Sequence, residues 1–144
     1  MLFRFVHCLL PCLFCMLPIA CADSSSTDNV EIRSQVKSPN GQLVATSFYC
    51  EGGGAAGFCF ENVDLQPAGQ AVDHRNGLLG KHKTWNSFSE ISLRWIDDQN
   101  LEVSYRQSDS PDYREHNLVR AKNKHGVQMH YRILTDGKEG KPAS

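Results

Sequence analysis

The sequence lacks several features that mark large classes of protein. An excess of one charge is missing, because 15 Lys and Arg stand against 16 Asp and Glu, which gives a net charge of −1. Nucleic-acid-binding proteins usually carry a strongly basic face, so we expect no nucleic-acid partner. A helical period is also missing, since no segment repeats its apolar residues at intervals of three and four. With 144 residues the chain suffices for one domain, and we expect strands to build it.

The motifs of common catalytic and cofactor-binding sites are absent as well. The run "GGGAAGF" has neither the lysine nor the hydroxyl residue of a phosphate-binding loop, and no G-x-S-x-G elbow occurs. Cys50 and Cys59 are too far apart for a zinc knuckle, and the histidines show no H-x-H or H-x-x-x-H spacing. We therefore expect no catalytic residue, no metal and no cofactor. The later histidines are all expected on the solvated surface: His74, His82, His116, His125 and His130.

Long uncharged runs are scarce, and the clearest one stands at the start of the chain. Residues 8–20, "CLLPCLFCMLPIA", carry no charge, follow a short basic head and precede small residues. The run is too short for a membrane-spanning helix, which needs about 20 apolar residues. Its position and its flanks are typical of a secretory signal peptide. We expect residues 1–22 to be this signal and residues 23–29, "DSSSTDN", to be a flexible tether.

Two alternatives remain for the end of the signal. Ala20 and Ala22 have the spacing that a general signal peptidase prefers, which would release a chain beginning at Asp23. Alternatively, "LPIAC" resembles a bacterial lipoprotein box with Cys21 as the lipidated residue, although Pro18 departs from that pattern. The first alternative predicts a periplasmic protein, and the second predicts a lipoprotein anchored to the membrane.

Residues 30–134 are expected to form an all-β domain, and residues 135–144 a disordered tail. Period-two alternation favours antiparallel strands with one wet face, in a single sheet or a small sandwich of about 5–7 strands. In the first predicted strand, this alternation places Val30, Ile32 and Val36 on one face. Further strands are predicted over 42–50, 58–66, 91–96, 101–106 and 126–134, with a long loop over 67–83.

The second half of the chain gives the clearest register. Pairing Leu93 with Val103 across the "IDDQN" turn puts the alternating apolar residues of both strands on one face, namely Ile91, Leu93, Trp95, Leu101, Val103 and Tyr105. A slip of one residue would move Trp95 into water. The last strand alternates in the same way, and its inward residues are expected to complete this core: Val127, Met129, Tyr131 and Ile133.

Of six cysteines, only Cys50 and Cys59 lie beyond the expected signal. An even pair in an oxidising compartment favours a disulfide. We expect "CEGGGAAGFC" to be the tip of a β-hairpin in which the two cysteines lie opposite each other and are bonded. The alternative is a thiol nucleophile beside a glycine-rich loop, which export makes less favoured.

Several segments resemble known sequences when they are taken in order along the chain. "SPNGQLVAT" is similar to the opening of a TolB-like or WD-type propeller blade, and "RWIDDQNLEVSY" resembles the strand, turn and strand that follow in such blades. From Val36 to Ile133 the chain more closely resembles small exported bacterial proteins of unknown function. These share an "SP(D/N)G" strand, a Gly-Ala loop, a "W…L…Y" hairpin and a last strand, and Cys59 departs from their pattern. The resemblance implies export and a β fold, and it implies no activity.

A run of basic residues offers a surface for an anionic partner, and it consists of Arg114, Arg120, Lys122, Lys124 and Arg132. The alternative is charged decoration that protects an edge strand from aggregation. Together these features predict a non-catalytic binding or interaction module of the bacterial envelope. Its partner would be an envelope protein or the membrane surface, and membrane attachment would depend on an anchor at Cys21. Alternatives are an inhibitor of a secreted enzyme, because "FYCEGG" resembles the opening strand of small lysozyme inhibitors, and a hydrolase or thiol enzyme.

Overall fold

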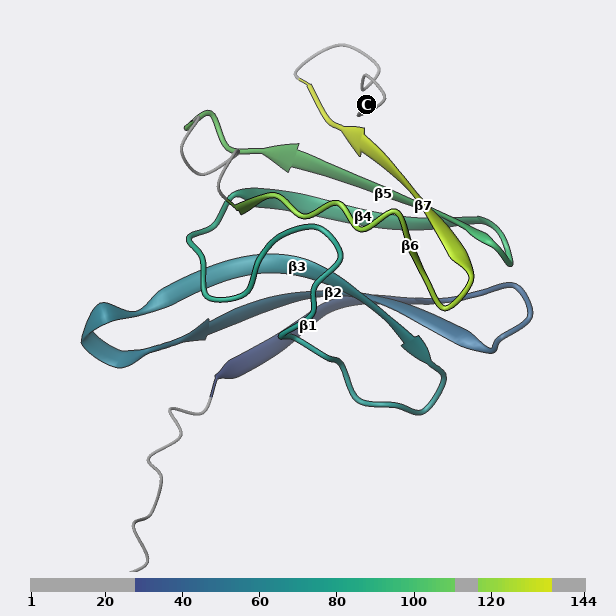
Figure 1. Cartoon of the computed structure of the whole chain (residues 1–144), viewed down its shortest axis with the longest axis horizontal. Helices are drawn as coiled ribbons and strands as arrows, with labels where there is room; N and C mark the ends of the chain where they lie inside the picture. Colours follow the sequence, from purple (N-terminus) through teal and green to yellow (C-terminus); the bar gives the residue numbers. More distant parts are fainter. Residues whose placement is uncertain (1–27, 111–116, 136–144) are drawn as a thin grey trace, which may run out of the picture.

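The computed structural model describes residues 28–110 and 117–135, which form two sheets stacked as layers (Figure 1). The first sheet has the order β1-β2-β3, with β1 (Asn29–Lys37), β2 (Leu43–Gly52) and β3 (Phe58–Pro67). The second has the order β4-β5-β7-β6, with β4 (Phe88–Asp97), β5 (Asn100–Gln107), β6 (Asn123–Lys124) and β7 (Val127–Ile133). The expected all-β class is confirmed in its sandwich form. The expected signal with Cys21, most of the tether, and residues 136–144 of the expected tail lie outside the described residues.

The first sheet is antiparallel, and its edge strand β1 carries a bulge at Arg33. Before the bulge, Val30 and Ile32 belong to the face that looks away from the second sheet. After it, Val36 lies opposite Ala45, which is part of the core between the sheets. The expectation that Val30, Ile32 and Val36 share one face is therefore wrong, because the extra residue of a bulge shifts the alternation by one position.

In the second sheet, the register predicted for the hairpin is confirmed, since Leu93 lies opposite Val103. The turn is tighter than the expected five residues, because Asp97 already pairs with Asn100. The last strand, β7, runs parallel to β5, so the expectation of a purely antiparallel arrangement is wrong at this position. Alternation along a strand reports which side chains are buried, but it does not report the direction of the neighbouring strand.

The core between the sheets depends on the strands that alternation identified. Leu101, Val103 and Tyr105 of β5 are fully buried. The indole Nε1 of Trp95 crosses from the second sheet to the first and donates a hydrogen bond of 3.0 Å to the Val36 carbonyl. The predicted inward residues of β7 all pack in this core, as expected: Val127, Met129, Tyr131 and Ile133.

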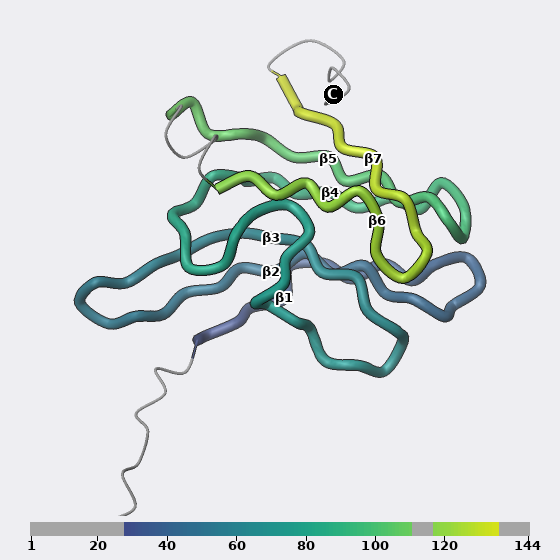
Figure 2. Tube along the Cα trace, viewed as in Figure 1, coloured from purple at the N-terminus to yellow at the C-terminus, as the bar shows by residue number. Residues whose placement is uncertain are grey.

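The long loop between β3 and β4 covers both faces of the first sheet. Figure 2 follows it from the end of β3, across this sheet and up to the start of β4. Val72 packs on the face that looks away from the second sheet, which we call the outer face. Leu78 and Leu79 then enter the core between the sheets, and the Leu78 amide donates to the Val63 carbonyl on the free edge of β3. The loop thereby shields an edge strand that would otherwise be open to pairing with another chain.

Asn62 of β3 fixes this loop through one fully buried carboxamide. Its Nδ2 donates to the Gly80 carbonyl at 2.6 Å, and its Oδ1 accepts from the amides of Val63, Leu79 and Gly80 at 2.8, 3.0 and 3.2 Å. A Cβ on Gly77 would overlap the Asn62 side chain, so only glycine permits this approach. Buried polar groups are costly unless they are hydrogen-bonded, and here one side chain satisfies four of them.

Asp64 holds the loop two residues further along the same strand. Its carboxylate is fully buried and accepts from the Leu65 amide at 2.8 Å, the Asp73 amide at 2.8 Å and Lys124 Nζ at 2.7 Å. The ion pair with Lys124 joins the first sheet to β6. A buried carboxylate is tolerated when it is paired and hydrogen-bonded, so Asp64 and Lys124 depend on each other.

Replacing Asn62 with Ala is expected to lower the free energy of unfolding by about 2–4 kcal/mol, because several buried backbone groups lose their partner. Urea denaturation followed by Trp fluorescence measures the change. Gln128→Ala, at an exposed position of β7, is the control and should change stability by less than about 0.5 kcal/mol. Equal, small effects of both variants would show that Asn62 does not hold the loop.

Candidate functional site

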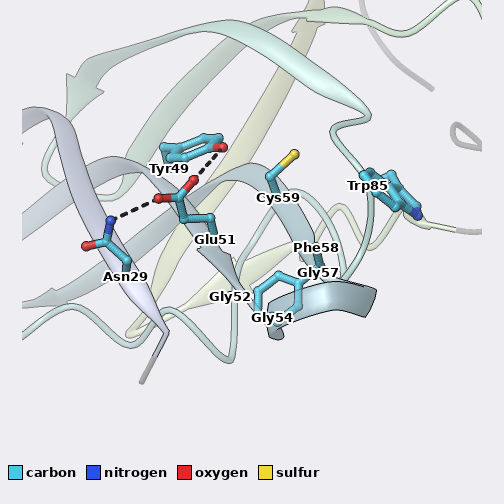
Figure 3. Close-up of a pocket in the computed structure, with 9 residues that line it drawn as sticks. All are labelled: Asn29, Tyr49, Glu51, Gly52, Gly54, Gly57, Phe58, Cys59 and Trp85. Carbon is cyan, nitrogen blue, oxygen red and sulfur yellow. Dashed lines mark hydrogen bonds between the residues drawn. The ribbon is translucent and has the colours of Figure 1, made fainter. Parts of the chain in front are cut away.

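The β2–β3 hairpin projects beyond the second sheet (Figure 1). The face of the hairpin that packs in the core nearer the middle of the sheet is therefore left uncovered at this end. It forms a depression of about 530 Å³ at the end of the hairpin. Figure 3 shows Tyr49, Glu51 and Cys59 along one part of it and Trp85 at the opposite side. The residues that line it are Asn29, Tyr49, Glu51, Gly52, Gly54, Gly57, Phe58, Cys59 and Trp85.

The Glu51 carboxylate is held in place by two neutral donors (Figure 3). Asn29 Nδ2 donates to Oε1 at 3.1 Å, and the Tyr49 hydroxyl donates to Oε2 at 3.2 Å. Burial raises the pKa of Tyr49 to about 12, and the neighbouring Cys59 and Glu51 add to this rise. Tyr49 therefore stays protonated and remains a donor at neutral pH. A carboxylate oxygen can accept more than one hydrogen bond, so both Glu51 oxygens keep acceptor capacity for a ligand.

Trp85 presents a large aromatic ring at the rim of the depression, where it is 56% exposed. A second hollow of about 520 Å³ shares Phe58 and Trp85 and is bordered by Lys83, whose Nζ lies 5.8 Å from the centre of the Phe58 ring. Tryptophan offers an apolar body and a polar N–H at low cost in side-chain entropy, which makes it common in binding surfaces.

The register of this hairpin contradicts the expected Cys50–Cys59 disulfide. Cys50 lies opposite Phe60, and Cys59 lies opposite Glu51. The last pair before the turn joins Gly52 to Phe58, so the connecting loop has an odd number of residues, and the two cysteines point to opposite faces of the sheet. Both thiols are free. The prediction is wrong because it assumed a loop of even length between the cysteines.

The surroundings of the Cys50 thiol make it unreactive in the folded protein. Cys50 is fully buried on the outer face beside Phe48 and Phe60. Burial raises the pKa of Cys50 to about 11, and the charges of Asp28 and Glu51 add to this effect. A thiol that stays protonated and buried is a poor nucleophile, so Cys50 gives no support to thiol catalysis.

The basic residues proposed as an anionic-partner surface are mostly engaged within the molecule. Lys124 pairs with the buried Asp64, Arg132 Nη2 lies 2.7 Å from Glu102 Oε1, and Arg120 Nε donates to the Tyr105 hydroxyl at 2.8 Å. Lys122 is exposed. Arg114 lies outside the described residues. The four described members of this set therefore do not form one free basic surface.

The outer face carries a cluster that sequence reasoning missed. Asp28 lies between two imidazoles of the long loop: His74 Nε2 is 3.2 Å and His82 Nε2 is 3.5 Å from the same carboxylate oxygen. The expectation that these histidines are solvated is wrong, because their side chains are only 23% and 19% exposed. His130 does face water, as predicted. Asp28 lies 46 residues before His74, so no spacing rule could have joined it to the two histidines.

Taken as a class, the fold is a small β-sandwich with a loop-covered outer face. Comparisons with protein-family models, with curated proteins and with solved structures find no match to this chain. Within the part of the chain that the structure describes, no helix reaches the length and apolar character of a membrane span. Over residues 28–110 and 117–135, no group of three His, Cys, Asp or Glu is arranged to hold a metal ion.

The free state of the two cysteines predicts the outcome of a labelling experiment. When the full chain is unfolded without reductant in the presence of an alkylating agent, the peptides that contain Cys50 and Cys59 should each carry one adduct. Reductant should leave the melting temperature of the folded protein unchanged. Recovery of a peptide pair joined through Cys50 and Cys59 would contradict the hairpin register.

Proposed function

We propose that this chain is an exported bacterial envelope protein that acts as a non-catalytic binding module, and that it holds its partner at the end of the β2–β3 hairpin. Export is supported by the pattern of residues 1–22. The main support for the binding surface is the exposed Trp85 beside the depression that contains Glu51. An exposed aromatic ring next to an oriented polar group is the arrangement that binding surfaces favour at their centre.

Binding is better supported than catalysis by the chemistry of the depression. The residues that line it include no histidine. Tyr49 is held in its protonated form, since its pKa is raised, and its hydroxyl is already donated to Glu51. A hydrolase or thiol enzyme would need a nucleophile and a base within hydrogen-bond reach of each other. The partner that fits this reading is an envelope protein, and attachment to the membrane would come from a lipid anchor at Cys21.

A narrower form of this function is an inhibitor of a secreted enzyme. The loop that joins β2 to β3 contains the exposed residues 53–56, and the hairpin that carries it is the part of the molecule that reaches farthest past the second sheet (Figure 1). A projecting, narrow tip of this kind is suited to entering the cleft of another protein. It fits the resemblance of "FYCEGG" to the opening strand of small lysozyme inhibitors.

Photo-crosslinking tests where the partner binds. A benzophenone amino acid in place of Trp85 should form a discrete adduct with an envelope protein, whereas the same group in place of Ile96 should not. Ile96 is a matched control, because it is 51% exposed and lies on β4 at its turn to β5. Once the partner is purified, Trp85→Ala should raise the dissociation constant at least about tenfold, as is typical of a central aromatic residue. Ile96→Ala should change it less than about twofold.

Equal crosslinking from both positions, or an affinity that is unaffected by Trp85→Ala, would place the partner elsewhere on the molecule and would overturn the proposed surface.

The inhibitor form has its own test. The purified chain should inhibit a lysozyme at micromolar concentration, and Ala55→Arg at the hairpin tip should remove the inhibition without changing the melting temperature. Lack of inhibition across several lysozyme classes would reject this narrower form and leave the general binding function to the crosslinking test.

A further inference from the structure

Two imidazoles share one buried carboxylate on the outer face of the first sheet. The Asp28 side chain is 6% exposed, and its Oδ2 faces Nε2 of both His74 and His82. Two further polar atoms of the cluster, Asp28 Oδ1 and His82 Nδ1, are buried and have no hydrogen-bond partner among the described residues. The two imidazoles are therefore held by one carboxylate oxygen, while the other carboxylate oxygen and one ring nitrogen remain without a partner among the described residues.

The surroundings of the cluster are apolar on the sheet side. The rings of Phe58 and Phe60 lie 5.7 and 5.6 Å from the His82 ring, centre to centre. Gly52 of β2 makes room for the carboxylate, because a Cβ there would lie 3.0 Å from Asp28 Oδ1 and 2.9 Å from the Phe58 ring. In this setting a net charge on the cluster is weakly screened and costly.

The charged and titratable groups around the cluster come from two elements. The loop contributes Arg75 and Lys83, and β2 contributes Cys50, whose thiol senses the Asp28 charge. Glu51 of β2 also acts on Cys50, but its side chain belongs to the depression on the other face. β3 contributes the two phenylalanine rings. Cys50 stays a neutral thiol because burial raises its pKa to about 11. The two loop cations disfavour an additional positive charge on the imidazoles.

The number of protons on the two imidazoles decides whether the charges within the cluster cancel. With one imidazolium, the pair of that ring and the Asp28 carboxylate is neutral. With two, the cluster carries a net positive charge beside Arg75 and Lys83. Burial lowers the pKa of His82, Asp28 opposes this effect, and His74, Lys83 and Arg75 add to the lowering. His82 Nε2 lies 3.5 Å from the carboxylate, and Nδ1 is buried without a hydrogen-bond partner among the described residues, so one of the two N–H groups of the imidazolium would have no acceptor there.

The cluster helps to hold the loop between β3 and β4 over an apolar part of the outer face. Phe48, Cys50 and Phe60 are fully buried on the outer face, although no second sheet lies there. The loop that covers them is fixed by Asp64 at Asp73 and by Asn62 at Gly80, next to the two histidines. Of the contacts that hold the loop, those with Asp28 involve histidine side chains, and burial lowers the pKa of one of them, His82.

We propose that Asp28, His74 and His82 form a proton-sensitive contact between the loop and the outer face. The loop stays closed while at most one of the two imidazoles is protonated, and it is released when the second imidazole binds a proton. The open state exposes the Phe48 and Phe60 side chains and the Cys50 thiol. This inference does not depend on the binding function proposed above.

The direction of the pH dependence follows from the depressed pKa of His82. In the open state, His82 is solvated and binds a proton below about pH 6.5. In the closed state, it binds one only at lower pH. The closed state therefore binds fewer protons, and it loses stability as the pH falls below about 6.5. Each unit of difference between the two pKa values multiplies the open population by about ten.

Reactivity of Cys50 in the full chain measures the opening. The protein is treated with 4,4′-dithiodipyridine, which reacts with thiols in mild acid, at about pH 7.5 and about pH 5. Peptide mass mapping gives the labelling rate of Cys50 relative to Cys59, which is partly exposed on the other face and serves as internal reference. We expect this ratio to rise severalfold at the lower pH while circular dichroism stays native. An unchanged ratio, or one that rises only with global unfolding, would overturn the proposal.

Two variants and one spectroscopic measurement identify the responsible group. His82→Gln cannot take a proton, so its labelling ratio should not depend on pH, whereas His130→Gln should behave like the wild type. If His82→Gln opens the loop at every pH, NMR titration of the histidine ring protons of the wild type still tests whether His82 is the responsible group. The midpoint of His82 should lie below about 6.5 and coincide with the rise in Cys50 reactivity. A His82 midpoint at or above that value would overturn the proposal.

Discussion

The buried carboxamide of Asn62 is the contact on which the arrangement of this small domain depends. It satisfies backbone groups of β3 and of the loop at once, in a place where water cannot do so. Since the loop is fixed at this point, Leu78 and Leu79 reach the core on one side of the sheet, and His74 and His82 reach Asp28 on the other. Asp64 adds a second fixed point two residues away. An edge strand that could have paired with another molecule becomes a scaffold instead.

The β2 and β3 strands of the first sheet are consequently buried on both faces along much of their length, whereas the edge strand β1 stays largely exposed. The second sheet covers one face and the loop covers the other, which explains why neighbouring residues of β3, such as Val63 and Asp64, are both fully buried. The end of the β2–β3 hairpin extends past the second sheet (Figure 1). The same hairpin thus presents Glu51 and Cys59 to an open depression on one face, and Cys50 and Phe60 to a closed cluster on the other.

This division separates two kinds of chemistry. The depression holds a carboxylate that is oriented by neutral donors and bordered by an exposed indole, and it is suited to contact with a partner. The outer face holds a carboxylate between imidazoles in an apolar setting, and it is suited to respond to protons. Both rely on the short distance between β1 and the hairpin tip, since Asn29 serves the first site and Asp28 the second.

The sequence by itself determined the β class, the register of the β4–β5 hairpin and the buried face of β7, because alternation at period two is a local property that burial imposes on every strand. It did not determine the face of Val36 beyond the bulge in β1, the parity of the loop between Cys50 and Cys59, or the parallel direction of β7. Each of these depends on a single inserted residue or on the choice of a neighbouring strand, and neither can be recognised from the order of apolar and polar residues in the sequence. The depression and the histidine cluster were decided by tertiary structure alone, since they join residues from β1, the hairpin and the loop that only folding brings together.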